Sequence, residues 1–113
     1  MLKSIPSNPN YLVSDKGIIF RKTVNEELKP LKPNYHLAYA TVQLGRRTEY
    51  VHRLVAEAFV SHRPEQTDVF HIDGDLTNNA ASNLLWVTPS QAQIYSSWLV
   101  EYRKSYFKPM ISY

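Results

Sequence analysis

The sequence contains no cysteine, no long hydrophobic run and little net charge. Without cysteine the chain can form neither disulfide bonds nor thiolate metal sites, so any metal ion must be held by oxygen or imidazole ligands. No window approaches the roughly 18 consecutive apolar residues that a membrane span needs. The N-terminal segment "MLKSIPSNPN" also lacks the apolar core of a secretory signal. These absences predict a soluble, cytoplasmic protein that does not associate with a membrane.

The formal net charge of +3 is small, but the charged residues are unevenly distributed. Residues 1–60 carry nine Lys and Arg against five Asp and Glu, whereas residues 61–113 carry four against five. A positive excess in the N-terminal half suits contact with phosphate groups. An excess this small is also common on an ordinary solvated surface, so charge alone does not decide for nucleic acid. The side chains expected to contact phosphate are Lys29, Lys32, Arg46, Arg47 and Arg53.

The length of 113 residues predicts a single domain. Tyr11–Ser14 and Gly17–Lys22 have the composition of two short strands joined by a turn, which predicts a β-hairpin. His36–Leu44 and Arg47–Val51, separated by Gly45 and Arg46, predict a second hairpin. The prolines of "KPLKPN" (residues 29–34) cannot donate ladder hydrogen bonds, so this segment is expected to be an exposed basic loop.

The second half of the chain combines helical and strand-like patterns. "VHRLVAEAF" (Val51–Phe59) has the apolar spacing of a short amphipathic helix. "DVFHI" and "NLLWV" are typical of short strands, and they flank a long polar loop whose side chains can bond their own backbone. Thr88 or Ser90 can cap a helix that runs to about Phe107.

Three of these stretches carry a family resemblance. "VHRLVAEAF" followed by "HIDGDLTNNAASNLLWVT" (His71–Thr88) resembles the core of the phage-type HNH endonucleases, a group that includes intron-encoded homing enzymes. "IPSNPNYLVSDKGIIF" is similar to the small module that commonly precedes that core. The resemblance covers the chain from about Ile5 to about Ala92. It implies an α+β fold in which N-terminal β-hairpins are followed by a ββα-metal core and a C-terminal helix. The implied parts of the single domain are 1–50, 51–93 and 94–113.

The resemblance also implies a chemistry, metal-assisted hydrolysis of a phosphodiester with Mg²⁺ or Mn²⁺ as cofactor. His71 matches the general base of the family and Asn83 matches the asparagine that braces the loop. The two positions that usually provide metal ligands hold Phe70 and Ala92, whose side chains cannot coordinate a cation. The ligands of a metal are therefore unknown. Asp68, on the same strand face as Phe70, and Asp73 in the loop are the candidate replacements.

The expected partner is double-stranded DNA. His52 and Arg53 are expected to contact the DNA backbone, although a plain surface helix explains them equally well. The aromatic C-terminal segment "IYSSWLVEYRKSYFKPMISY" is a candidate contact for a protein partner or a second copy of the chain, because aromatic side chains dominate interface hot spots. Its alternative role is packing on the core.

Three hypotheses about function remain open. The first is an HNH-family DNA-binding protein with weak or lost phosphodiester cleavage. The second is an active, metal-dependent DNA nicking endonuclease with unusual ligands. The third is a phage-encoded protein-binding module, an inhibitor or regulator, on an HNH scaffold that acts in the cytoplasm of the host cell. The loss of both expected ligands favours the first.

Overall fold

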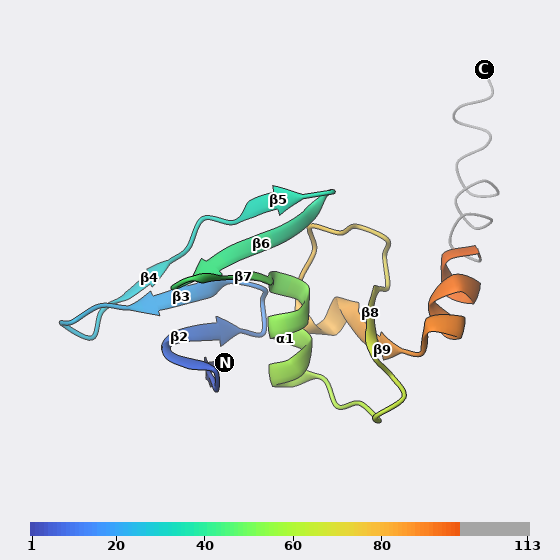
Figure 1. The fold of residues 1–113 in the computed structure, drawn as a ribbon, viewed down its shortest axis with the longest axis horizontal. Helices are drawn as coiled ribbons and strands as arrows, with labels where there is room; N and C mark the ends of the chain where they lie inside the picture. The colour runs from blue at the N-terminus through green and yellow to red at the C-terminus, as the bar shows by residue number, and fades with distance from the viewer. Residues whose placement is uncertain (98–113) are drawn as a thin grey trace, which may run out of the picture.

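The structure, a computed structural model, describes residues 1–97, which form three small antiparallel sheets around one central helix (Figure 1). The N-terminal sheet contains β1 (Leu2–Ile5), β2 (Asn8–Ser14), β3 (Ile19–Lys22) and β4 (Leu28–Pro30). The second sheet contains β5 (Asn34–His36), β6 (Tyr39–Leu44) and β7 (Arg47–Tyr50). Helix α1 (Val51–Phe59) leads to β8 (Asp68–His71), the short helix η1 (Ala81–Asn83) and β9 (Leu84–Val87). The mixed α+β architecture is the fold class that the sequence predicts.

The first predicted hairpin is confirmed as β2 and β3, and two strands extend it. β1 pairs with β2 along the segment that begins the chain. β4 pairs with β3 and places Pro30 opposite Phe20. The prediction of a loop for residues 29–34 was therefore wrong at both ends, since β4 includes residues 29 and 30 and β5 begins at Asn34. Proline is tolerated there because β4 is an edge strand, where a missing N–H costs no ladder bond.

The second predicted hairpin is confirmed as β6 and β7, but its first strand is shorter than expected. The run from residue 36 to 44 is broken by a turn at Leu37 and Ala38, whose φ angles are 51° and 71°. Left-handed backbone is usually marked by Gly, Asn or Asp, and neither residue is one of these. The turn therefore could not be predicted from residue types, and it creates the additional strand β5.

Helix α1 has the predicted bounds and lies between the N-terminal sheets and the β8–β9 hairpin (Figure 1). Its buried side chains are those of Val51, His52, Leu54, Val55 and Ala56. The indole of Trp86 on β9 donates hydrogen bonds to the carbonyl oxygens of Ala56 (3.2 Å) and Val60 (3.0 Å). These two contacts satisfy the indole N–H of a large buried side chain. They also hold β9 against the C-terminal end of the helix.

A second helix covers residues 89–97 of the described chain. Thr88 caps it as predicted: its hydroxyl accepts a hydrogen bond from the Gln91 amide (3.2 Å), and the Gln91 side chain accepts one from the Thr88 amide (3.0 Å). The predicted continuation to residue 107 and the aromatic contact surface lie outside the described residues. Within residues 1–97 no helix is long and apolar enough to cross a membrane.

Candidate functional site

The β8–β9 hairpin places His71 at the end of its first strand, opposite Leu84. The side chain is only 3% exposed, and its Nε2 lies 2.8 Å from Oδ1 of Asn79 in the loop. Because an amide oxygen only accepts, a hydrogen bond between these two atoms requires the proton on Nε2. A proton-accepting role for His71 would therefore use Nδ1.

Asn83 holds the loop between β8 and β9 together. Its Nδ2 donates to Oδ1 of Asp73 (2.9 Å) and to the carbonyl oxygen of Asn78 (2.9 Å), and its Oδ1 accepts from the Asp73 amide (3.0 Å). The Asn83 side chain is 8% exposed, whereas its partner Asp73 is exposed, so these bonds are partly buried. These are the contacts that a loop-bracing asparagine makes.

Asp73 uses both carboxylate oxygens within the same loop. Oδ1 accepts from the Asp75 amide and from Asn83, and Oδ2 accepts from the side chain of Asn78 (2.9 Å). These bonds, with that from Asn78 the strongest, lower the pKa of the Asp73 carboxyl. Bonds from the side chain and backbone of Thr77 lower the pKa of Asp75 in the same way. The two carboxylates stabilise the loop.

The N-terminal module supports this loop, which the sequence did not reveal. The carbonyl oxygen of Asp15 in the β2–β3 turn accepts a hydrogen bond from the Ala81 amide (2.8 Å). Gly17, with a φ of 91°, lies so close to the backbone of Asn79 that an added Cβ would come within 2.8 Å of it. The glycine is required by both its conformation and this approach. The first hairpin thereby positions Asn79, the partner of His71.

The ring of His71 belongs to a cluster of four rings. The other three are those of Tyr39 from β6, Tyr50 from β7 and His52 from α1. The ring centroids of His52 and His71 are 5.2 Å apart, and those of Tyr39 and His52 are 5.0 Å apart. His52 is 7% exposed, and its buried Nδ1 has no hydrogen-bond partner among the described residues. Burial, followed by the charges of His71 and Arg53, lowers the pKa of His52 to about 4. Its imidazole is therefore neutral at pH 7.

The burial of His52 was not expected from the sequence, and its contact with DNA stays a prediction. The helical pattern places residue 52 at the start of α1, where a surface position was equally plausible. In the fold the ring of Tyr39, which follows the turn at residues 37–38, packs against the ring of His52. Spacing along the sequence carries no signal of this contact, because Tyr39 and His52 come from different elements.

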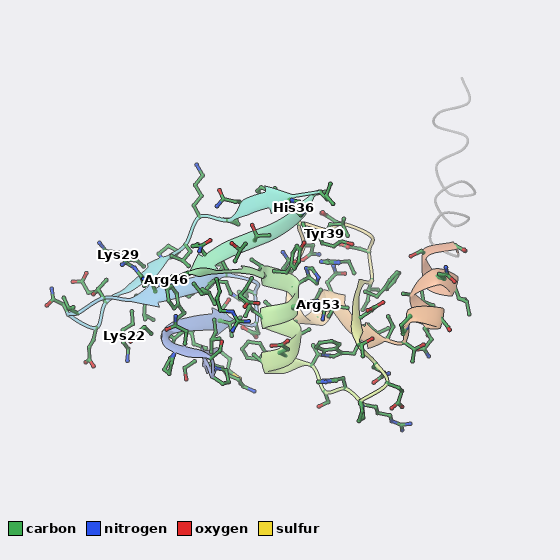
Figure 2. All side chains as sticks on the ribbon, viewed as in Figure 1. Lys22, Lys29, His36, Tyr39, Arg46 and Arg53 are labelled. Carbon is green, nitrogen blue, oxygen red and sulfur yellow. The ribbon has the colours of Figure 1, made fainter. Side chains whose placement is uncertain are left out.

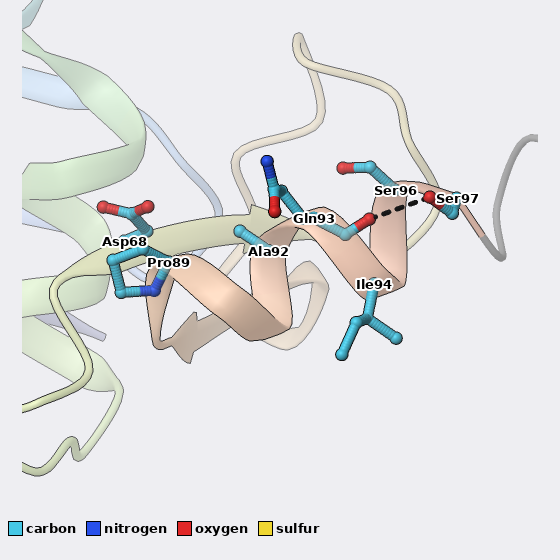
Figure 3. Close-up of a pocket in the computed structure, with 7 residues that line it drawn as sticks. All are labelled: Asp68, Pro89, Ala92, Gln93, Ile94, Ser96 and Ser97. Atoms are coloured by element: carbon cyan, nitrogen blue, oxygen red, sulfur yellow. Dashed lines mark hydrogen bonds between the residues drawn. The ribbon is translucent and has the colours of Figure 1, made fainter.

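The two expected metal-ligand positions remain apolar in space. The Phe70 ring packs against Tyr95 with centroids 5.6 Å apart. Figure 3 shows that Ala92 has Pro89, Gln93 and Ser96 as its neighbours around a cavity, with Asp68 as the carboxylate beside it. An oxygen-lined cradle for a divalent ion normally offers one or two free carboxylates.

The two candidate replacements have other contacts. Asp68 lies 4.0 Å from the guanidinium of Arg53, with both side chains partly exposed, and Asp73 accepts the loop hydrogen bonds described above. Within residues 1–97 no group of three or more His, Asp or Glu side chains could hold a metal ion. The side chains of Phe70 and Ala92 therefore do not fit as the two ligands that the family resemblance implies, and the roles of Asp68 and Asp73 stay predictions.

The predicted DNA-contacting residues fall into two groups. In Figure 2, Lys29 and Arg46 lie with Lys22 on the side of the molecule formed by β3 and β4. Arg53 lies apart from them, on α1 and near Tyr39. Lys29, Lys32, Arg46 and Arg47 are all exposed, as contact with a phosphate backbone requires. Arg47 forms a salt bridge with Glu49, with 3.3 Å between Nε and Oε1. Arg53, on the helix, is partly exposed, as is its neighbour Asp68.

Residues 49–94, which contain α1, both site strands and the loop, match the family model described as HNH endonuclease. The chain belongs to the HNH endonuclease family. The matched residues include His71 and Asn83, whose roles as general base and loop-bracing asparagine stay predictions.

Relatives of this HNH chain include viral and prophage proteins. It is 34% identical over 94 residues to an HNH endonuclease of Acanthamoeba polyphaga mimivirus, covering 80% of this chain and 28% of that protein. It is 28% identical over 99 residues to the SPbeta prophage-derived protein YosQ of Bacillus subtilis, which is named as an HNH homing endonuclease; the match covers 85% of this chain and 57% of YosQ.

A solved structure of the HNH homing endonuclease I-HmuI, which binds and cleaves DNA, superposes with a TM-score of 0.66 at 31% identity. The match covers 93% of this chain and 58% of that one, so it includes the N-terminal hairpins as well as the core. This chain spans between about a quarter and three fifths of the length of the relatives that it matches.

Proposed function

We propose that this protein binds double-stranded DNA through its HNH scaffold and does not cleave it by the metal-dependent route of the family. The observation that carries the proposal is the apolar character of the two ligand positions, Phe70 and Ala92. Support for DNA binding comes from the likeness to I-HmuI, which binds and cleaves DNA, and from the exposed basic side chains on the hairpins. His71 and Asn83 act in this proposal as parts of the loop structure, with His71 a latent base.

The expected loss of cleavage follows from the side chains at the two ligand positions. A phenyl ring and a methyl group offer no lone pair to a hard cation. The carboxylate of Asp68, which lines the same cavity as Ala92, has a guanidinium 4.0 Å away that competes with any ion for it. Without a cation at the leaving oxygen, a nuclease of this type lacks several kcal/mol of transition-state stabilisation.

The test is an attempt to restore cleavage. Supercoiled plasmid is incubated with Mg²⁺ or Mn²⁺ and with either the natural protein or the double variant Phe70→Asp, Ala92→Asn, which returns oxygen ligands to both positions. We expect no nicking by the natural protein and measurable nicking by the double variant. The triple variant that adds His71→Ala should be inactive and serves as the matched control. Nicking by the natural protein in either ion, abolished by His71→Ala, would overturn the proposal and establish the second hypothesis.

DNA binding is tested by fluorescence anisotropy over a series of salt concentrations. Arg46→Gln should weaken binding and reduce the salt slope by about one, as expected for loss of one phosphate contact. Arg63→Gln is the matched control, because Arg63 is also exposed but lies in the loop before β8. A Kd that does not rise with salt, or equal effects of the two substitutions, would contradict the proposed DNA surface.

The hypothesis of a protein-binding module rests on the aromatic segment of residues 94–113, most of which lies outside the described residues. It stays a prediction.

A further inference from the structure

A cavity of about 370 Å³ lies between α1, β8 and the second sheet. This volume falls in the range of about 300–1,000 Å³ that is typical of small-ligand sites. Its lining includes Tyr39, Tyr50, His52, Arg53, Asp68 and Phe70. Phe70 and Ala92 both line it, so the cavity lies at the place where the family resemblance puts the metal ligands, and it carries four rings instead of those ligands.

The charges around the cavity favour an uncharged ligand. Arg53 and Asp68 are the two ionised groups that line it among the described residues, and they lie 4.0 Å apart with opposite signs. His52 adds no charge at neutral pH, because burial lowers its pKa to about 4. A phosphate placed there would gain the attraction of Arg53 but meet the repulsion of Asp68. A neutral group with both donors and acceptors would meet no such conflict.

The rings of the cavity favour a flat ligand. Tyr39 and Tyr50 each lie against His52, with centroid distances of 5.0 Å and 5.4 Å. Aromatic side chains of this kind form stacking platforms for bases, whatever the base, because every base has a π face. His52 also contributes a buried Nδ1 that has no hydrogen-bond partner among the described residues, and a buried polar atom of this kind is costly unless a ligand or water reaches it.

We propose that the cavity receives one unpaired nucleobase of the bound DNA, which stacks on the tyrosines and directs its polar edge to Arg53 and Asp68. Arginine donates to base carbonyl and ring-nitrogen acceptors, and a carboxylate accepts from base amino groups, so the pair matches both kinds of group on one edge. The aromatic side chain of a protein partner such as phenylalanine would leave both charged groups unsatisfied. The proposal rests on the DNA binding proposed above.

A base can enter only after it leaves the stack, which is least costly where it has no partner in the opposite strand. The affinity should therefore be higher for a duplex that carries one bulged base than for the matched duplex. Stacking of one base commonly changes affinity by a factor of about ten or more. The effect must depend on the base itself and not on the flexibility of the bulged backbone.

The experiment compares three duplexes of otherwise identical sequence by fluorescence anisotropy with the full chain: matched, with one bulged nucleotide, and with an abasic bulge. We expect about tenfold tighter binding of the bulged duplex, with the abasic bulge similar to the matched duplex. Equal affinity for the bulged and abasic duplexes would overturn the proposal. Absence of binding to all three would contradict the DNA-binding function itself, so the two failures are distinguishable.

Two variants on one helix localise the effect. Ala92 lines this cavity, whereas its neighbour Gln93 lines only the adjoining hollow of Figure 3. Ala92→Leu should fill part of the cavity and abolish the preference for the bulged duplex. Gln93→Leu should leave the preference intact. As an independent readout, 2-aminopurine placed in the bulge should be quenched by the natural protein and by Gln93→Leu but not by Ala92→Leu. A preference that persists in Ala92→Leu would assign the bulged base to another surface.

Discussion

The buried histidine His52 leads to a specific pH dependence of stability. Its pKa is about 4 in the folded protein and near 6.5 in the unfolded chain. Between these values the unfolded state binds more protons than the folded state, so the free energy of unfolding must fall as the pH is lowered. The contribution is fully present above pH 6.5 and is lost progressively down to about pH 4.

The magnitude follows from the same two pKa values. Each pH unit between them is worth about 1.4 kcal/mol, which gives a loss of about 3 kcal/mol across the interval. This is a substantial part of the stability of a small domain, which is typically about 5–15 kcal/mol. The cause is mainly the burial of the ring, with smaller contributions from the charges of His71 and Arg53.

The measurement is urea unfolding, followed by tryptophan fluorescence, at several pH values from 7 to 4, for the natural protein and for His52→Phe. The phenyl ring keeps the aromatic contacts with Tyr39 and Tyr50 but cannot take a proton. The difference in unfolding free energy between the two proteins should therefore shift by about 3 kcal/mol in favour of the variant as the pH falls. Parallel pH profiles, or a His52 titration midpoint near 6.5 by NMR, would refute the reasoning.

Three further substitutions test the loop and the helix cap by the same urea assay. Asn83→Ala should destabilise by about 2–3 kcal/mol, because three partly buried hydrogen bonds are lost, and exposed Asn25→Ala should change little. Gly17→Ala should cost about 2 kcal/mol or more, given its left-handed φ and the close backbone of Asn79, and should perturb the NMR signals of His71. Thr88→Ala should cost about 1 kcal/mol through its cap. A loss below about 0.5 kcal/mol in any of the three would contradict the role assigned to it.

Local patterns predicted some elements well because those elements depend on neighbours in the sequence. The helix Val51–Phe59, the strands around His71 and the cap at Thr88 all follow from spacing and residue type. The two N-terminal hairpins were predicted, but the strands β1, β4 and β5, which pair with them, were not. The sequences of β1 and β4 carry no clear strand pattern, yet both segments pair with neighbouring strands. The turn at residues 37–38 lacks the usual turn residues.

The site shows the same division. The motif pointed to His71 and Asn83. The residue types at positions 70 and 92, Phe and Ala, already excluded metal ligands at those two positions. The contact of Asn79 with His71, the support from Gly17 and the burial of His52 were not predictable. Each joins segments that are distant in the sequence, and no periodicity within one element encodes such a contact.

The sequence by itself determined the family, the position of the histidine and the absence of oxygen or imidazole ligands at two key places, because these depend only on which side chains the chain carries. Only the tertiary structure decided that Asp73 is engaged within the loop and that Asp68 faces Arg53. It also decided that rings from four elements, β6, β7, α1 and β8, line a cavity of balanced charge. Distances between side chains on separate elements arise from packing, and packing exists only in the folded chain.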